Sequence, residues 1–68
     1  MFGERFKQLR KERKVLQQQV ADVMGVKLRA YQYYEKEQTE PNINALIALA
    51  DFYDVSIDYL VGRTDTPK

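Results

Sequence analysis

Apolar residues recur at intervals of three and four along most of this chain, and this spacing restricts it to helices. Phe2, Phe6 and Leu9 share one face of a predicted helix over about residues 2–13. The chain has no internal repeat and no alternating pattern long enough for a useful β-strand. The sequence therefore predicts an all-α fold.

Capping and helix-breaking residues divide the periodic segments. Gly25 suits a left-handed cap at the end of a helix, and Asn42 suits an N-cap after Pro41. Ser56 can cap a short last helix that stops before Gly62. The predicted elements are five short helices, at about residues 2–13, 17–24, 28–36, 43–53 and 57–61.

The spacing also predicts which sides of two helices face the core. In the helix over 28–36, Ala30, Tyr31 and Tyr34 cluster on one side at about 100° per residue. In the helix over 43–53 we expect an inward face made of Ile43, Leu46, Ile47, Ala50 and Tyr53.

Composition makes an enzyme a poor interpretation. The 68 residues include no cysteine and no histidine, and Ser56 is the only serine, so no catalytic triad or cysteine-ligated zinc is available. A chain this short cannot also enclose a deep substrate cavity. We therefore expect no catalytic residue, metal, cofactor or small-molecule substrate. No apolar run approaches the roughly 18 residues of a membrane span, so we expect no membrane partner.

The charges are divided unevenly along the chain. Residues 1–36 carry nine Lys or Arg against four acidic residues, whereas residues 37–68 carry two against six. One interpretation is that the first half faces a polyanion and the second does not. The other is two differently solvated faces, and charge alone leaves both open.

The turn between the second and third predicted helices has a distinctive composition. Ala21 precedes Gly25 by four residues, and the turn itself is Met24-Gly25-Val26-Lys27. The small residue lets the next helix cross closely, and the glycine permits an abrupt change of direction. Many helical hairpins share this pattern, so it indicates a crossing helix pair but no particular function.

A wider set of residues is more specific. It comprises Phe6, Arg10, Gln17, Val20, Ala21, Gly25, Val26, Tyr34, Glu35, Pro41, Leu46, Leu49, Ala50, Val55, Ser56 and the closing segment 58–65. With these residues the chain, over about residues 3–62, resembles the Xre/Cro-like helix-turn-helix family of phage and bacterial repressors. The resemblance implies a lambda-repressor-like DNA-binding domain over residues 1–62, with the helix-turn-helix formed by the second and third helices. The third helix would lie in the major groove, usually in a dimer on a pseudo-palindromic operator.

The side of the third helix opposite its tyrosine pair has side chains that suit base edges. Arginine suits guanine O6 and N7, glutamine suits adenine N6 and N7, and leucine can touch a thymine methyl group. The family's base-reading positions match Lys27, Leu28, Arg29, Gln32 and Tyr33. The alternative is a merely solvated polar face.

Other polar residues are candidates for phosphate contacts. Gln17 matches the family's phosphate-binding position at the start of the second helix, and the alternative is a solvated residue in a glutamine run. The remaining candidates are Lys11, Lys36, Asn42 and Asn44, although Asn42 could be a plain N-cap.

The resemblance also implies an ion pair between Arg10 and Glu35 at the edge of the core, with two exposed charges as the alternative. Three positions depart from the family pattern. Leu16 and Lys27 stand where Ser or Thr N-caps are usual, and Glu37 replaces a glycine. We therefore expect water or phosphate to satisfy both helix starts, and the turn at Glu37 to differ.

The C-terminal part carries more apolar residues than a short fifth helix can cover. We expect a homodimer interface there, formed by Phe52, Ile57, Tyr59 and Val61. A missing C-terminal domain covering Phe52 and Val61 is the alternative. Residues 63–68 are expected to be a frayed polar tail or the start of a linker.

The leading functional hypothesis is a cytoplasmic, nucleoid-associated regulator of transcription that binds double-stranded DNA, most simply a repressor. One alternative is an antitoxin that binds DNA and a toxin protein through the same type of domain. Another is a helical adaptor that binds only proteins.

Overall fold

The computed structural model describes residues 1–68 as a bundle of five helices without strands. The helices are α1 (Phe2–Arg13), α2 (Gln17–Met24), α3 (Leu28–Glu35), α4 (Ile43–Tyr53) and α5 (Ile57–Leu60). This confirms the predicted all-α fold, and each helix ends within one residue of its predicted boundary. No helix has the length and apolarity needed to cross a membrane.

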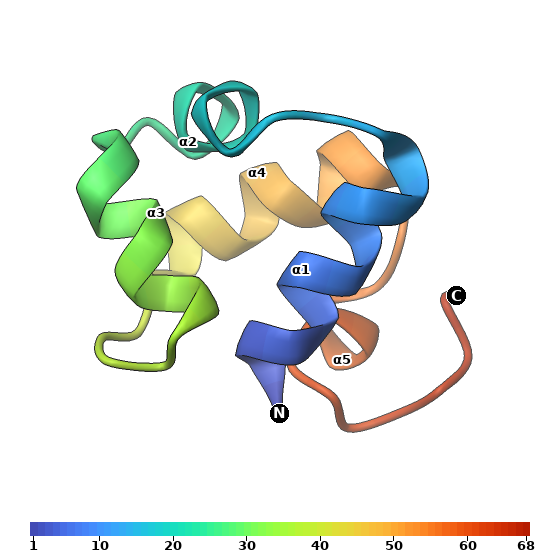
Figure 1. The fold of residues 1–68 in the computed structure, drawn as a ribbon. Coiled ribbons are helices and arrows are strands. Elements are labelled where there is room, and N and C mark those ends of the chain that lie inside the picture. The colour runs from blue at the N-terminus through green and yellow to red at the C-terminus, as the bar shows by residue number, and fades with distance from the viewer.

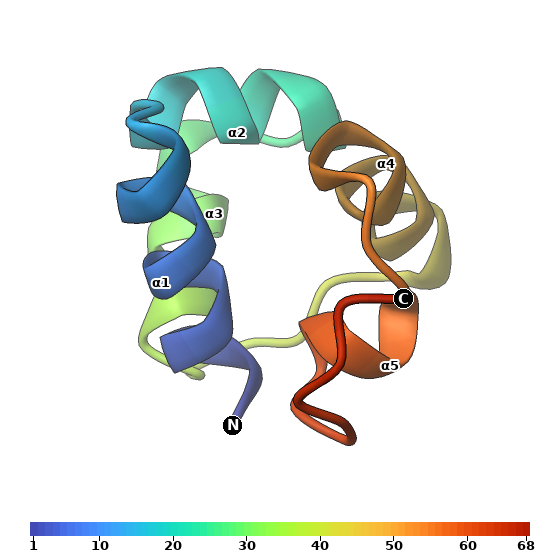
Figure 2. The same ribbon diagram turned by 90° about the vertical axis from the view of Figure 1, so that its right-hand side faces the viewer.

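The helices surround one core. α1 packs beside α3, α2 packs on both α3 and α4, and α5 joins α4 to α1 (Figure 1). In the view turned by 90°, α1, α2, α4 and α5 follow one another round a ring (Figure 2). The buried core residues come from all five helices. The largest fully buried side chains are Tyr31, Tyr53, Phe6, Leu9, Leu49, Leu60 and Val20.

Two predicted caps are present as side-chain hydrogen bonds. Asn42 Oδ1 accepts from the Ala45 N–H at 2.8 Å, and Ser56 Oγ accepts from the Tyr59 N–H at 3.0 Å. At Leu16 the cap side chain contributes nothing, but Gln19 Oε1 accepts from the Leu16 N–H at 2.7 Å. The start of α3 has no side-chain cap, so its first N–H groups are available to another acceptor.

The predicted inward face of α4 was right for Ala50 and Tyr53, which are buried, and for Leu46, which packs against the core, but wrong for Ile43 and Ile47. Ile43 and Ile47 are 61% and 45% exposed, and the buried residues of the helix are Ala45, Leu49, Ala50 and Tyr53. Nine of the eleven residues of α4 are apolar, so periodicity allows several inward faces. The packing of α2 and α5 against α4 selects the side that is covered.

The loop after α3 keeps a left-handed turn although its residue is a glutamate. Glu37 has a φ of 58°, a backbone conformation that residues other than glycine seldom adopt. Its Oε2 accepts from the Gly3 N–H at 3.2 Å and lies 3.8 Å from the N-terminal amine. The departure from glycine at this position therefore ties the loop to the start of α1.

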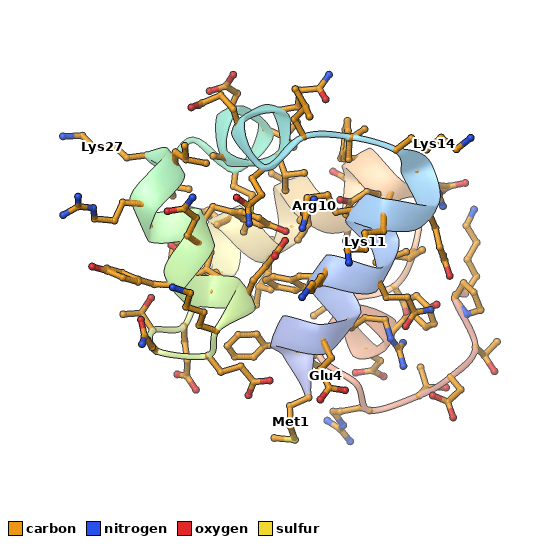
Figure 3. The ribbon with its side chains drawn as sticks, viewed as in Figure 1. Met1, Glu4, Arg10, Lys11, Lys14 and Lys27 are labelled. Atoms are coloured by element: carbon orange, nitrogen blue, oxygen red, sulfur yellow. The ribbon has the colours of Figure 1, made fainter.

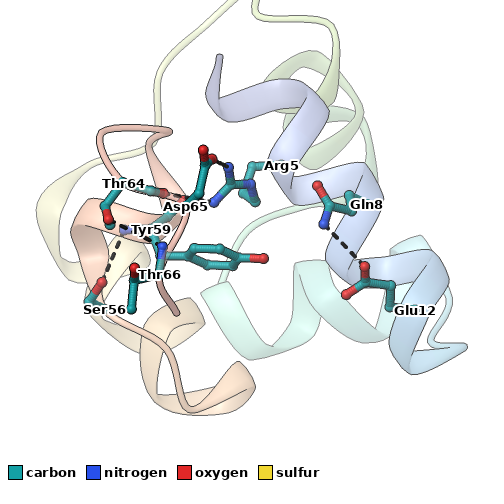
Figure 4. A network of polar contacts seen from close by, with 8 residues as sticks. All are labelled: Arg5, Gln8, Glu12, Ser56, Tyr59, Thr64, Asp65 and Thr66. Carbon is teal, nitrogen blue, oxygen red and sulfur yellow. Dashed lines mark hydrogen bonds and ion pairs between the residues drawn. The ribbon is translucent and has the colours of Figure 1, made fainter. Parts of the chain in front are cut away.

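The tail is not a frayed end in this structure. The Ser56 N–H donates to the Pro67 carbonyl at 2.7 Å, and Lys68 Nζ lies 2.8 Å from Asp54 Oδ1. Arg5 donates to the Thr64 carbonyl and to the Asp65 carboxylate (Figure 4). The segment therefore folds back along α5.

Candidate nucleic-acid interface

The turn between α2 and α3 has the geometry expected from its composition. Gly25 adopts φ 72°, and no atom lies within 4 Å of where a Cβ would stand. Its conformation is therefore the reason for a glycine here. Ala21 is fully buried, and its carbonyl accepts from the Val26 N–H at 3.0 Å. α2 packs on α3 directly across this turn.

α3 presents a polar side to solvent. Tyr31 and Tyr34 are buried, and Ala30 packs against the core. The opposite side carries the exposed Arg29, Tyr33 and Lys36 together with the half-buried Leu28 and Gln32, and Lys27 extends from the end of the helix (Figure 3). The five proposed base-reading residues thus share one accessible surface.

A polar groove runs between α1 and α3, next to the solvent-facing side of α3. It is lined by seven residues, none of them hydrophobic: Lys7, Arg10, Lys11, Gln17, Gln32, Glu35 and Lys36. Three of the proposed phosphate contacts, at Lys11, Gln17 and Lys36, therefore come together. Asn42 and Asn44 lie outside this groove at the start of α4, and Asn42 Oδ1 caps the helix by accepting from the Ala45 N–H.

Lys7 belongs to the groove and was missed by sequence reasoning. It stands four residues before Lys11 on α1, so both ammonium groups lie on one side of the helix. That spacing is visible in the sequence, but nothing in the sequence shows that this side of α1 faces α3. The groove therefore holds Lys7 in addition to Lys11 and Lys36, the two lysines predicted to contact phosphates.

The carboxylate of Glu35 lines the groove and accepts hydrogen bonds from three other side chains. Arg10 Nε donates to Glu35 Oε2 at 2.7 Å and Arg10 Nη2 donates to Oε1 at 3.2 Å, so the ion pair is bidentate. The Tyr31 hydroxyl also donates to Oε2, and Gln17 Nε2 donates to Oε1 at 3.2 Å. Figure 3 shows Arg10 reaching from α1 into the space between the two helices.

These donors keep the carboxylate ionised. Burial by itself raises the pKa of Glu35, but the hydrogen bonds from Arg10, Tyr31 and Gln17 outweigh burial and hold that pKa below its usual value. The hydrogen bond to Glu35 also raises the pKa of the Arg10 guanidinium. Both partners are therefore charged at neutral pH.

The four residues predicted for a dimer interface differ in how much of each side chain is exposed to solvent. Phe52 is 41% exposed, and Ile57 and Val61 are half-buried. Tyr59 is buried as part of the core, and the Arg5 guanidinium stands 3.9 Å from its ring centroid (Figure 4). Its inclusion in an exposed apolar surface was therefore wrong.

Comparison with known proteins identifies the architecture. A family model described as helix-turn-helix matches residues 6–60. The chain belongs to the helix-turn-helix family. In this helix-turn-helix domain, α2 and α3 form the motif, and the matched segment contains the whole groove between α1 and α3.

Relatives of the domain are transcriptional regulators of bacteria and phages. It is 42% identical over 67 residues to the uncharacterised HTH-type transcriptional regulator YobD of Bacillus subtilis, covering 98% of this chain and 60% of the relative. A crystal structure of a transcriptional regulator from Listeria innocua superposes with a TM-score of 0.87 at 39% identity, over 91% of this chain and 58% of that one. The chain spans about 60% of the length of the curated relatives that it matches.

One similar structure contains DNA. The crystal structure of the P22 c2 repressor in complex with a synthetic operator superposes with a TM-score of 0.82 at 37% identity, covering 88% of this chain and 91% of that one.

Proposed function

We propose that residues 1–62 bind double-stranded DNA in a sequence-specific manner, with α3 in the major groove, and that the protein regulates transcription, most simply as a repressor. The observation that carries this proposal is the solvent-facing side of α3 directly beside a groove lined by three lysines. Lysines suit phosphates as point charges, and the side chains of α3 suit base edges. The likeness to a repressor bound to an operator supports the same function.

Binding-site selection from random duplex DNA tests the proposal. Arg29→Ala should lose about 1–3 kcal/mol on the best selected site and relax the preference at one position. Lys36→Ala and Lys11→Ala should weaken all sequences alike and flatten the salt dependence. Arg63→Ala, which removes an exposed arginine beyond α5, is the matched control and should bind as the wild type does. Unchanged preference in Arg29→Ala would place another element in the groove.

The proposed assembly on DNA is a homodimer formed through the α4–α5 side. Phe52 is exposed near the C-terminal end of α4, the end that lies away from α3 (Figure 1), and this part of the chain also carries the exposed Asp51, Asp54 and Asp58. An acidic surface is repelled by phosphates, so this side should point away from the duplex. Two-fold pairing would separate the two α3 helices by roughly 34 Å, one turn of DNA.

Sedimentation with and without a selected site tests the dimer. Phe52→Glu should abolish binding of the second domain, whereas Ile47→Glu, a change of the same kind at another exposed apolar position of α4, should leave it intact. One domain per site at saturation would refute the dimer. Loss of pairing in Ile47→Glu instead of Phe52→Glu would move the interface to another side of α4.

A further inference from the structure

Gln17 connects the core ion pair to the base-facing side of α3. Its Nε2 donates to Glu35 Oε1 at 3.2 Å, and its Oε1 accepts from Gln32 Nε2 at 3.3 Å. We propose that Gln17 is a positioning residue that orients the Gln32 amide, and that this orientation makes Gln32 selective for adenine over guanine. The inference rests on the proposed DNA-binding function.

The direction of this chain of hydrogen bonds is set by Glu35. An ionised carboxylate can only accept hydrogen bonds, and it offers about four acceptor sites. Arg10 supplies two donors, the Tyr31 hydroxyl a third and Gln17 a fourth. If the Gln17 amide were reversed, its carbonyl oxygen would face a carboxylate oxygen. Gln17 must therefore turn its NH₂ group to Glu35 and its oxygen to Gln32.

The same reasoning extends one residue further. Because Gln17 presents an oxygen, Gln32 must turn its NH₂ group inward and commit one of its two amide hydrogens. The other hydrogen and the carbonyl oxygen stay free. Adenine offers one acceptor, N7, and one donor, the N6 amino group, whereas guanine offers two acceptors, N7 and O6. The free groups of Gln32 match adenine and cannot satisfy both acceptors of guanine.

The neighbouring glutamines do not share this role. Gln18 Nε2 donates to Asp22 at 2.9 Å on the exposed side of α2, and Gln19 accepts from the start of its own helix. Gln18→Ala is therefore a matched control: it removes an amide at the adjacent position and leaves the contact between Gln17 and Gln32 intact.

The experiment starts from a random-sequence duplex library selected by the wild-type protein. Gln32→Ala identifies the operator position that Gln32 reads, and titrations of the selected duplex and its single-pair variants then measure the preference at that position. Wild-type discrimination should be roughly 5- to 150-fold. Gln17→Ala should lower it at least about fivefold at that position alone, beyond any loss common to all sequences. Gln18→Ala should not change it.

Two further measurements separate positioning from stability. Thermal melts of each variant show whether the folded state is intact, and a small general loss of stability does not relax the preference at one base pair. The double variant Gln17→Ala, Gln32→Ala should show no further loss of preference beyond Gln32→Ala alone, because the two residues act in series.

The measurements distinguish failure of the inference about Gln17 from failure of the proposed DNA-binding function. If Gln17→Ala keeps the wild-type preference at the Gln32 position, Gln17 does not control how Gln32 reads its base, and the inference is overturned while DNA binding stands. If the two losses of preference simply add, the residues act independently and the inference is overturned in the same way. If the wild type selects no sequence, the proposed function fails and the inference fails with it.

Discussion

Replacing Glu35 by glutamine removes the charge of the Arg10–Glu35 pair while keeping the size of the side chain. The Glu35 side chain is 7% exposed and that of Arg10 is 17% exposed, so water reaches the pair poorly. An amide can accept from one or two of the four donors around it, but not from all four in the same geometry. Arg10 is left without an opposite charge beside it.

The loss can be bounded from these contacts. Breaking a fully buried pair by removing one partner costs about 3–5 kcal/mol. Here Arg10 can turn into the polar groove beside Lys7 and Lys11 and regain some hydration, so we expect about 2–3 kcal/mol. For a domain of this size that lowers the melting temperature by roughly 10–20 °C. Total stability for a chain of this length is on the order of 3–10 kcal/mol, so the variant should be only marginally stable.

The assay is a thermal melt followed by circular dichroism at several pH values. Because the pKa of Glu35 is lower in the folded state, its stabilisation is complete above the unfolded value of about 4.3 and is lost as pH falls through the folded pKa. The difference between wild type and variant should thus be largest near pH 7 and shrink below about pH 4.

Asp65→Asn is the control for this measurement. It makes the same carboxyl-to-amide change in the Arg5–Asp65 pair, where the Asp65 side chain is fully exposed, and should leave the melting temperature unchanged. Equal melting temperatures for wild type and Glu35→Gln at pH 7 would show that the pair is solvated and would refute the reasoning. A difference that stays constant down to pH 3 would show that the lost charge is not its cause.

Three further predictions concern groups whose surroundings differ. The Tyr53 hydroxyl is buried without a hydrogen-bond partner, whereas that of Tyr31 donates to a carboxylate, so urea unfolding should show Tyr53→Phe neutral or stabilised and Tyr31→Phe destabilised by about 1–3 kcal/mol. A Cβ on Gly3 would stand 2.5 Å from the Glu35 backbone oxygen at the end of α3. Gly3→Ala should therefore lower the free energy of unfolding more than Gly25→Ala, which adds only the roughly 1–2 kcal/mol cost of a left-handed backbone conformation. The reverse order would show that α1 shifts freely. Arg5→Lys removes the planar guanidinium that donates to Tyr59, Thr64 and Asp65. Hydrogen exchange at the Ser56 N–H, which donates to the Pro67 carbonyl, should then accelerate, whereas the α2 amides should stay protected.

The helices were predictable because their boundaries depend on local chemistry. Gly25, Asn42 and Ser56 act on backbone groups within three or four residues, and each does in the structure what its type predicts. The inward face of α4 depends on where α2 and α5 lie, and a helix that is apolar on most sides does not specify this. The docked tail depends on Arg5, about sixty residues away, which no local pattern connects to Asp65.

The candidate site divides in the same way. The outward side of α3 follows from Tyr31 and Tyr34, because two buried aromatic residues at a spacing of three settle the direction of an eight-residue helix. The role of Gln17 does not follow from its surroundings in sequence, since it is the first of three equivalent glutamines. Its hydrogen bonds to Glu35 and Gln32 across the groove distinguish it from the other two in the structure.

Of the residues of α3, Glu35 should affect both the stability of the fold and the choice of base, because it holds the ion pair and is bonded through Gln17 to Gln32. Arg29 and Tyr33 are exposed and make no hydrogen bond to the core through their side chains, so their replacement should alter base contacts at little cost in stability. Tyr31 and Glu35 face inward, and changing either disturbs the ion pair. Gln32 is bonded through Gln17 to that same carboxylate. A change at Gln32 should therefore alter one base preference, whereas a change at Glu35 should alter that preference and the stability of the fold together.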